Sequence, residues 1–148
     1  MAVISQSIYH IVFSTFSQEE TITNNGQRIL FKYIWEILKN RNCELYRING
    51  TANHVHLAIQ LQPLVPLDAL IKDIQQSTTT FIEESRIFPE FAGWQDGYYA
   101  FSHSFKEKSN LIEFIKKQEE LHQETTFQEE IKDLLKTHGG GVKINSHS

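Results

Sequence analysis

Hydrophobic residues follow a strand-like pattern in four segments of the chain. Residues 8–13 are mostly β-branched or aromatic, which is typical of a strand. Residues 43–49 and 54–61 are two more strand-like segments, and residues 50–53 between them have the composition and length of a hairpin connection. Residues 98–104 complete a predicted set of four strands.

Between and after these strands, apolar residues recur at helical spacing. One amphipathic helix is predicted from residue 29 to residues 40–42, after a Thr-Asn-Asn-Gly breaker at 23–26. A second follows two prolines and covers residues 67–82. Two C-terminal helices are predicted over 111–118 and, behind a capping-box pattern, over 126–135.

The first six elements follow the order βαββαβ, which is the split βαβ or ferredoxin-like arrangement. We therefore predict an α+β fold, in which a four-stranded antiparallel sheet carries two helices on one face and has the C-terminal helices near the other. Within residues 54–61, apolar side chains alternate with His54 and His56. Both histidines are thus predicted on the less apolar face of the sheet.

The size and composition fit a single domain. The chain has 148 residues, of which 40% are apolar and 22% charged, enough for one hydrophobic core but too few for two ordinary domains. We expect one domain over residues 1–148, with a tail that frays from about residue 139. A single cysteine excludes an internal disulfide, and no segment has the pattern of a signal peptide or a membrane span. The composition therefore predicts a cytoplasmic protein with no membrane role.

The formal net charge of −4 gives no sign of nucleic-acid binding. The charges are unevenly placed, however, because Arg41 and Arg47 belong to a cation-rich first half, whereas acidic residues crowd the last two helices. A basic surface on the first helix and the adjoining strand is one interpretation, and an ordinary solvated helix face is the other. Lys106 and Lys108, just before the helix at 111–118, are better placed to meet a phosphate.

His54 and His56 are the first candidates for chemistry. Side chains alternate along a strand, so a His-x-His pair points both imidazoles the same way, close enough to bind one divalent ion. The spacing alone is unspecific, and two outward-facing polar histidines are the plainer interpretation.

Gln118 is the second candidate, because it lies on the apolar stripe of the helix at 111–118. A buried carboxamide needs hydrogen-bond partners. If this helix crosses the open face of the sheet, Gln118 would complete a His-His-Gln site; the alternative is a glutamine at the helix edge that bonds to backbone.

Aromatic residues around a glycine-bearing loop form the third candidate. Trp94 and Tyr98 flank this loop, and Trp94 has the sequence context of an exposed side chain. Such aromatics suit stacking on unpaired bases, although a strand that faces the core explains them equally well.

Several ordered motifs together carry a family resemblance. They are the strand at 9–13, Asn-His-Val-His-Leu at 53–57, Trp-Gln-Asp-Gly-Tyr at 94–98, Phe-Ile-Lys-Lys-Gln at 114–118 and Phe-Gln-Glu-Glu at 127–130. In this order, the sequence resembles the small insertion-sequence transposases of the HUH single-tyrosine group, which include the REP-associated tyrosine transposases.

The resemblance implies a specific activity. In such enzymes the two histidines and a helix glutamine, here His54, His56 and Gln118, hold Mg²⁺ or Mn²⁺, which polarises the scissile phosphate of single-stranded DNA. A tyrosine then attacks and forms a 5′-phosphotyrosine. The resemblance also implies two kinds of partner: hairpin DNA at the ends of the insertion-sequence element, and a second copy of the chain in a homodimer.

One position departs from the family pattern. The nucleophilic tyrosine normally lies four residues before the glutamine, where this chain has Phe114, which has no hydroxyl. Tyr98 and Tyr99 are the nearest other tyrosines, but they belong to the predicted strand. Cleavage is therefore in question, and the alternative functions are an inactive hairpin-binding module or repressor, or a structural dimer that binds no nucleic acid. Asn53 is a second departure, since an acidic residue is common before the first histidine.

Overall fold

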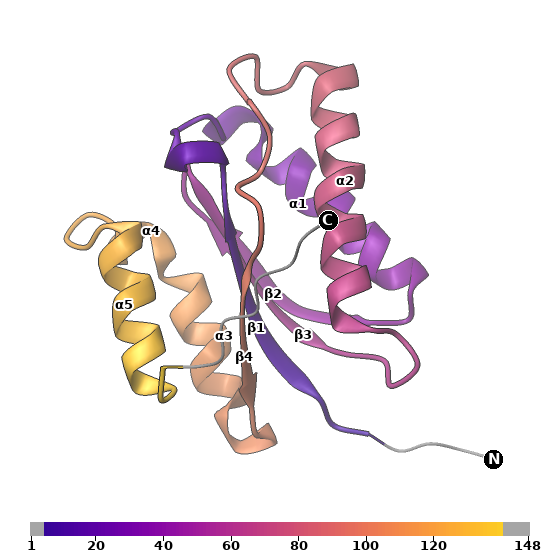
Figure 1. Cartoon of the computed structure of the whole chain (residues 1–148), viewed down its shortest axis with the longest axis vertical. Helices are drawn as coiled ribbons and strands as arrows, with labels where there is room; N and C mark the ends of the chain where they lie inside the picture. Colours follow the sequence, from indigo (N-terminus) through magenta and orange to yellow (C-terminus); the bar gives the residue numbers. More distant parts are fainter. Residues whose placement is uncertain (1–4, 141–148) are drawn as a thin grey trace.

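A computed structural model describes residues 5–140 of the chain (Figure 1). The strands are β1 (Ile8–Ser14), β2 (Glu44–Gly50), β3 (His54–Gln60) and β4 (Tyr99–His103). The helices are η1 (Phe16–Gln18), α1 (Asn24–Asn40), α2 (Leu67–Ser85), η2 (Phe105–Glu107), α3 (Lys108–Lys116), α4 (Gln118–Leu121) and α5 (Phe127–Thr137). The frayed tail predicted from about residue 139 lies almost entirely outside the described residues.

The four strands form one sheet in the order β2-β3-β1-β4, and every neighbouring pair is antiparallel. β1 and β3 are the central strands, and their register pairs Val12 with His56 and His10 with Ala58. This arrangement confirms the predicted ferredoxin-like α+β fold.

One face of the sheet packs on α1 and α2 (Figure 1). The strands contribute alternate apolar residues such as Phe13 and Leu57, and the helices contribute stripes that include Leu30, Ile34 and Ile74, all nearly without exposed surface. This layer is the main hydrophobic core, and it keeps the central strands fixed.

The opposite face of the sheet packs on α3, α4 and α5, drawn in orange and yellow in Figure 1. Val12 and Phe101 of the sheet meet Phe127 and Ile131 of α5 in a small apolar cluster. A second cluster joins Ala58 and its neighbours to α3. The sheet is therefore covered on both sides, so the outward-facing histidines expected from the strand pattern are instead buried.

Several helix boundaries differ from the sequence prediction. α1 begins at Asn24 and so includes the Asn-Asn-Gly expected as a breaker. Gly26 fits there because a Cβ atom at that position would lie 2.6 Å from the ring of Phe88. The predicted helix at 111–118 is interrupted at Lys117, after which Gln118 begins the short helix α4.

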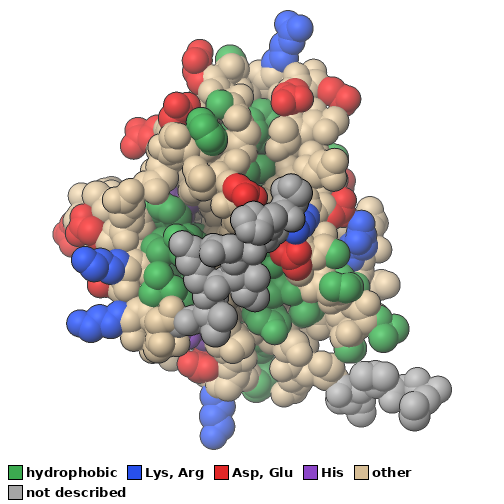
Figure 2. All heavy atoms as spheres, viewed as in Figure 1, with side chains coloured by type: hydrophobic (Ala, Val, Ile, Leu, Met, Phe, Trp, Pro, Cys, Tyr) green, Lys and Arg blue, Asp and Glu red, His purple; other side chains and the backbone are tan. Residues whose placement is uncertain are grey.

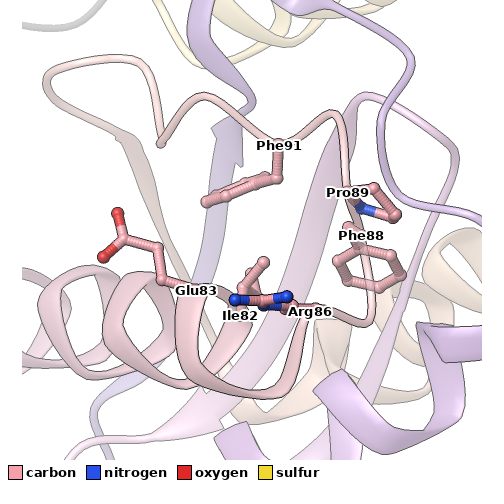
Figure 3. A pocket seen from close by; sticks show the side chains of 6 residues that line it. All are labelled: Ile82, Glu83, Arg86, Phe88, Pro89 and Phe91. Carbon is pink, nitrogen blue, oxygen red and sulfur yellow. The ribbon is translucent and has the colours of Figure 1, made fainter.

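Among residues 5–140, no helix is both long and apolar enough to cross a membrane. A shallow cavity of about 350 Å³ lies at the C-terminal end of α2, on the α1–α2 side of the sheet (Figure 3). Its lining is Ile82, Glu83, Arg86, Phe88, Pro89 and Phe91.

Candidate metal centre

His54 and His56 project from β3 onto the same face of the sheet, beneath α4 and α5. Both side chains have no exposed surface. The ring of Phe127 from α5 lies against His54, with centroids 4.6 Å apart. The strand therefore aims both imidazoles into the interior between the sheet and the C-terminal helices.

The carboxylate of Glu130 lies among three imidazoles. Its Oε1 atom is 2.9 Å from His56 Nε2, 3.5 Å from His54 Nε2 and 3.1 Å from His122 Nε2. The first contact is a hydrogen bond, whereas the orientation at His122 does not meet hydrogen-bond geometry. Glu130 is only 3% exposed, which makes it a charged group enclosed by possible metal ligands.

Gln118 joins the same cluster and is itself fully buried. Its Oε1 atom lies 3.2 Å from His54 Nε2, and its Nε2 atom donates to Glu130 Oε2 at 2.9 Å. The structure thus brings His54, His56 and Gln118 together. The backbone-bonded alternative for this glutamine is wrong, because its carboxamide bonds to side chains of the cluster.

The neighbours of His54 determine where its proton lies. Its Nδ1 atom is 2.8 Å from Asn53 Oδ1 and 2.9 Å from Thr51 Oγ1. Since an amide oxygen can only accept, Nδ1 carries the proton and donates it. In the neutral ring, Nε2 then carries no proton. Its lone pair faces the oxygens of Gln118 and Glu130, both of which are acceptors. This buried nitrogen would be satisfied by a cation.

Burial and neighbouring charges shift the pKa values of the cluster. Burial lowers the pKa of His54 to about 3, and the nearby His56 adds to this effect. Burial also lowers the pKa of His56, although Glu130 opposes the shift. For Glu130, burial alone would raise the pKa, but contacts with His122, His56 and Gln118 outweigh it and hold the pKa well below its ordinary value. The cluster therefore combines neutral imidazoles at His54 and His56 with an ionised carboxylate at Glu130, which is the protonation state that binds a metal cation.

His10 from β1 contacts the cluster through the second ring nitrogen of His56. Its Nε2 atom is 2.7 Å from His56 Nδ1, and the two rings stack with centroids 4.9 Å apart. Burial lowers the pKa of His10 well below its ordinary value. A hydrogen bond to the second ring nitrogen fixes the orientation of a ligating histidine, so His10 is placed to position His56.

Phe114 lies at the edge of the cluster on α3. Its half-buried ring is edge-on to His10 and His56, with centroids 5.7 Å and 5.9 Å apart. The position that the family resemblance assigns to the nucleophilic tyrosine is therefore close to the histidines, and a hydrocarbon ring occupies it.

The two predicted aromatic contacts with DNA lie on the other side of the sheet. The half-buried indole of Trp94 packs on Phe13 and donates its N–H to Thr78 Oγ1 at 2.8 Å. Tyr98 donates its hydroxyl to Asp68 of α2 at 2.9 Å. The expectation of an exposed Trp94 is wrong, because its ring and its N–H are used in packing against the α1–α2 layer.

The predicted cationic contacts are spread over the molecule. Arg41, Arg47 and Lys106 are all exposed, and Arg41 is paired with Asp73 at 2.6 Å. The ammonium group of Lys108 lies over the ring of Tyr46, 4.5 Å from its centroid. On the face drawn in Figure 2, Lys and Arg side chains are scattered among acidic ones and form no continuous basic field.

Sequence reasoning did not single out His10, His122 or Glu130 as site residues. The signal for Glu130 was its place three residues after Phe127, on the apolar stripe of α5. His122 similarly follows Gln118 by four residues, which places both on one helical face. In each case a polar residue on a stripe that faces inward indicates a buried polar cluster.

The donor set fits a metal ion. His54, His56, His122 and Glu130 offer one ligand atom each, and these atoms all lie within 4.8 Å of one another. Imidazole nitrogens and a carboxylate oxygen are common ligands of divalent metals in proteins. The bare Nε2 of His54 provides a separate reason to place a cation there.

The sheet order and the buried cluster define an α+β protein in which residues of the central strand β3 and of the C-terminal helical segments form a histidine-rich group that could hold a metal ion. Residues 3–118 match the family model described as "Transposase IS200 like". This match spans most of the chain, so the protein belongs to the IS200-like transposase family, a family of DNA transposases. The family predicted from the sequence motifs is thereby confirmed.

Solved structures show the same fold. A protein from Deinococcus radiodurans R1 assigned as a transposase superimposes with a TM-score of 0.63 at 15% identity, over 80% of this chain and 95% of the other. A REP-associated tyrosine transposase bound to a REP hairpin superimposes with a TM-score of 0.64 at 12% identity, over 82% of this chain and 72% of the other. No curated protein sequence matches this chain.

Proposed function

We propose that this protein binds hairpin-bearing single-stranded DNA and a divalent metal ion, and that it does not cleave the DNA through a 5′-phosphotyrosine. The observation that carries the proposal is the ring of Phe114, which lies against His10 and His56 and has no hydroxyl. A phosphotyrosine requires an oxygen nucleophile, so the covalent step has no group to start from at this position.

Other tyrosines on the same face of the sheet do not replace Phe114. Tyr99 is in register with Val12, which is in register with His56, so Tyr99 is two strand spacings, or about 10 Å, from that histidine. Tyr46 donates its hydroxyl to Gln60, four residues and about 13 Å along β3 from His56. Neither position adjoins the cluster as Phe114 does.

In this proposal, His54, His56 and Gln118 hold the metal ion, and the family resemblance implies Mg²⁺ or Mn²⁺. A divalent ion in such a centre acts as a Lewis acid on a phosphate oxygen. Asn53 and Thr51 orient His54 through its Nδ1–H, and His10 orients His56.

The choice of DNA ligand has a separate basis. One of the structural neighbours is described as bound to a REP hairpin, which supports hairpin DNA as the ligand class. Lys106 and Lys108, at the start of the helical segment that leads to Phe114, are the proposed phosphate contacts. The homodimer implied by the resemblance is part of the same proposal.

Fluorescence anisotropy tests the binding. Labelled single-stranded oligonucleotides with varied hairpin stems are compared with unstructured oligonucleotides of equal length, at two salt concentrations and with Mn²⁺ present. We expect a preference for hairpins and an affinity that falls as salt rises. Equal or absent binding of both pools at low salt would contradict the proposal and favour a structural role. Light scattering on the same samples measures the oligomeric state.

A further inference from the structure

His122 and Glu130 are the two members of the buried cluster that the proposed function does not use. Both have a donor atom within reach of His54 and His56. We infer that His54, His56, His122 and Glu130 together form a closed four-ligand site for a transition-metal ion of the zinc class. The inference rests on the metal centre of the proposed function: it keeps His54 and His56, puts His122 and Glu130 in place of Gln118 as ligands, and puts an ion of the zinc class in place of Mg²⁺ or Mn²⁺.

The spacing of the donor atoms agrees with four-coordinate binding. Metal–ligand bonds of about 2.0–2.1 Å at tetrahedral angles place neighbouring ligand atoms about 3.3 Å apart. Glu130 Oε1 lies 2.9 Å, 3.1 Å and 3.5 Å from the Nε2 atoms of His56, His122 and His54. Glu130 Oε1 therefore already lies close to tetrahedral separation from each of the three nitrogens, and all four donor atoms lie within 4.8 Å of one another.

Hydrogen bonds among the protein groups do not satisfy every polar atom of this cluster. His56 can donate from Nε2 to Glu130 while its Nδ1 accepts from His10. His54 cannot do the same, because Asn53 takes its Nδ1 proton and its Nε2 faces only acceptors. A cation bound by Nε2 and by the carboxylate removes this repulsion, since both then act as ligands.

Gln118 has a positioning role in this site. Its Nε2 donates to Glu130 Oε2, which holds the carboxylate so that Oε1 points to the three imidazoles. Three nitrogens and one carboxylate oxygen favour zinc, cobalt or nickel over Mg²⁺, which prefers oxygen ligands and keeps several waters.

Two structural consequences follow. Four protein ligands fill the coordination sphere of a tetrahedral ion, as in structural sites, whereas catalytic sites keep one position open. The ligands also come from β3, from the residue that follows α4 and from α5. Metal binding therefore fastens the C-terminal helices to the sheet.

Cobalt spectroscopy tests the inference on the full chain. The metal-stripped protein is titrated with Co²⁺, whose visible absorption is intense in four-coordinate sites and weak in six-coordinate ones. We expect one equivalent of Co²⁺ to give intense bands, Zn²⁺ to displace it, and an excess of Mg²⁺ to leave the bands unchanged. Zn²⁺ is also expected to raise the Tm by roughly 5 °C or more, because it binds only the folded state.

Variants identify the ligands. Glu130→Gln and His122→Ala are each expected to weaken Co²⁺ binding by at least roughly 100-fold, since even the loss of an outer partner of a ligand costs 10- to 100-fold. Glu120→Gln, an exposed glutamate on α4, is the matched control and should bind like the wild type. Circular dichroism in EDTA shows whether each variant folds.

The outcomes separate the two proposals. Weak six-coordinate bands, or unchanged affinity in folded Glu130→Gln and His122→Ala alongside loss in His54→Ala, would overturn the closed site and leave the three-ligand centre intact. Failure of the wild type to bind Co²⁺ or Zn²⁺ would overturn both metal sites. The preference for hairpin DNA is measured independently, so its loss would count only against the proposed function.

Discussion

The ring of Phe114 lies edge-on to the imidazole of His56, with centroids 5.9 Å apart. Under the proposed function, Phe114 occupies the position of the nucleophilic tyrosine, and its ring brings no hydroxyl to the histidines. The proposal therefore assigns this protein metal binding through the histidines without the covalent step.

Replacing His10 tests its role behind the cluster. In His10→Phe, the Nδ1 atom of His56 loses its partner at 2.7 Å, so the ring is no longer held in one orientation. We expect Co²⁺ affinity to fall roughly 10- to 100-fold while the fold is kept. Tyr9→Phe, on the opposite face of the same strand, is the control, and equal affinities in the two variants would refute the positioning role.

Asn53 offers a change that should strengthen the site. In Asn53→Asp, a carboxylate replaces the amide oxygen that accepts from His54 Nδ1 at 2.8 Å, which makes Nε2 a stronger ligand. Isothermal titration with Co²⁺ is expected to show tighter binding, by roughly tenfold, and Asn53→Ala weaker binding. Weaker binding by Asn53→Asp would mean that the long bond from Asn53 Nδ2 to the backbone of Gln18 matters more.

Acid should destabilise the metal-free protein. The folded-state pKa of His54 is about 3, against an ordinary value of 6.5, so between these values the unfolded chain binds a proton that the folded protein does not. The free energy of unfolding therefore falls as pH drops below about 6.5, by at most roughly 1.4 kcal/mol per pH unit for this group. The lowered pKa values of His10, His56 and Glu130 act in the same direction.

Urea unfolding in EDTA at pH 7.5, 6 and 5 measures this effect. His54→Gln should show a shallower dependence on pH, because it lacks the imidazole whose pKa is lowered from 6.5 to about 3. A wild type that grows more stable as the pH falls would contradict the assignment of neutral, buried imidazoles.

The lysines near α3 should contribute to DNA binding through phosphate contacts. Lys106→Gln and Lys108→Gln are each expected to lower hairpin affinity and to reduce the slope of log K against log salt by about one. Arg41→Gln is the control, because the guanidinium of Arg41 is already paired with the carboxylate of Asp73 at 2.6 Å. If Arg41→Gln weakened binding as much as the lysine variants, the contact surface would lie on the α1–α2 side.

The sheet and the His-x-His pair were predictable because both depend on local periodicity. Alternation along residues 54–61 places His54 and His56 on one face whatever covers it. Their burial was not predictable in the same way, since it depends on how α5 docks through Phe127 and Ile131. The place of Glu130 in the cluster was not predicted either, because a run of acidic residues suggests a solvated helix face.

For the aromatic residues at 94–98, the sequence suggested a contact with DNA that the structure does not support. Trp94 and Tyr98 have the composition of a base-stacking loop, but their partners are Thr78 and Asp68, on a helix far earlier in the sequence. No local pattern records such long-range hydrogen bonds. Composition therefore suggested a nucleic-acid contact where the structure uses both side chains for packing.

A covalent-adduct assay decides whether this protein cleaves DNA through a tyrosine. Wild-type protein is incubated with end-labelled, hairpin-bearing single-stranded DNA and Mn²⁺, and the products are separated under denaturing conditions. We predict that the wild type binds the hairpin in the native gel and gives no denaturant-resistant adduct, and that Phe114→Tyr gives an adduct. An adduct formed by the wild type would contradict the proposal that Phe114 leaves the protein without a nucleophile, and its loss in Tyr99→Phe would identify Tyr99 as the nucleophile.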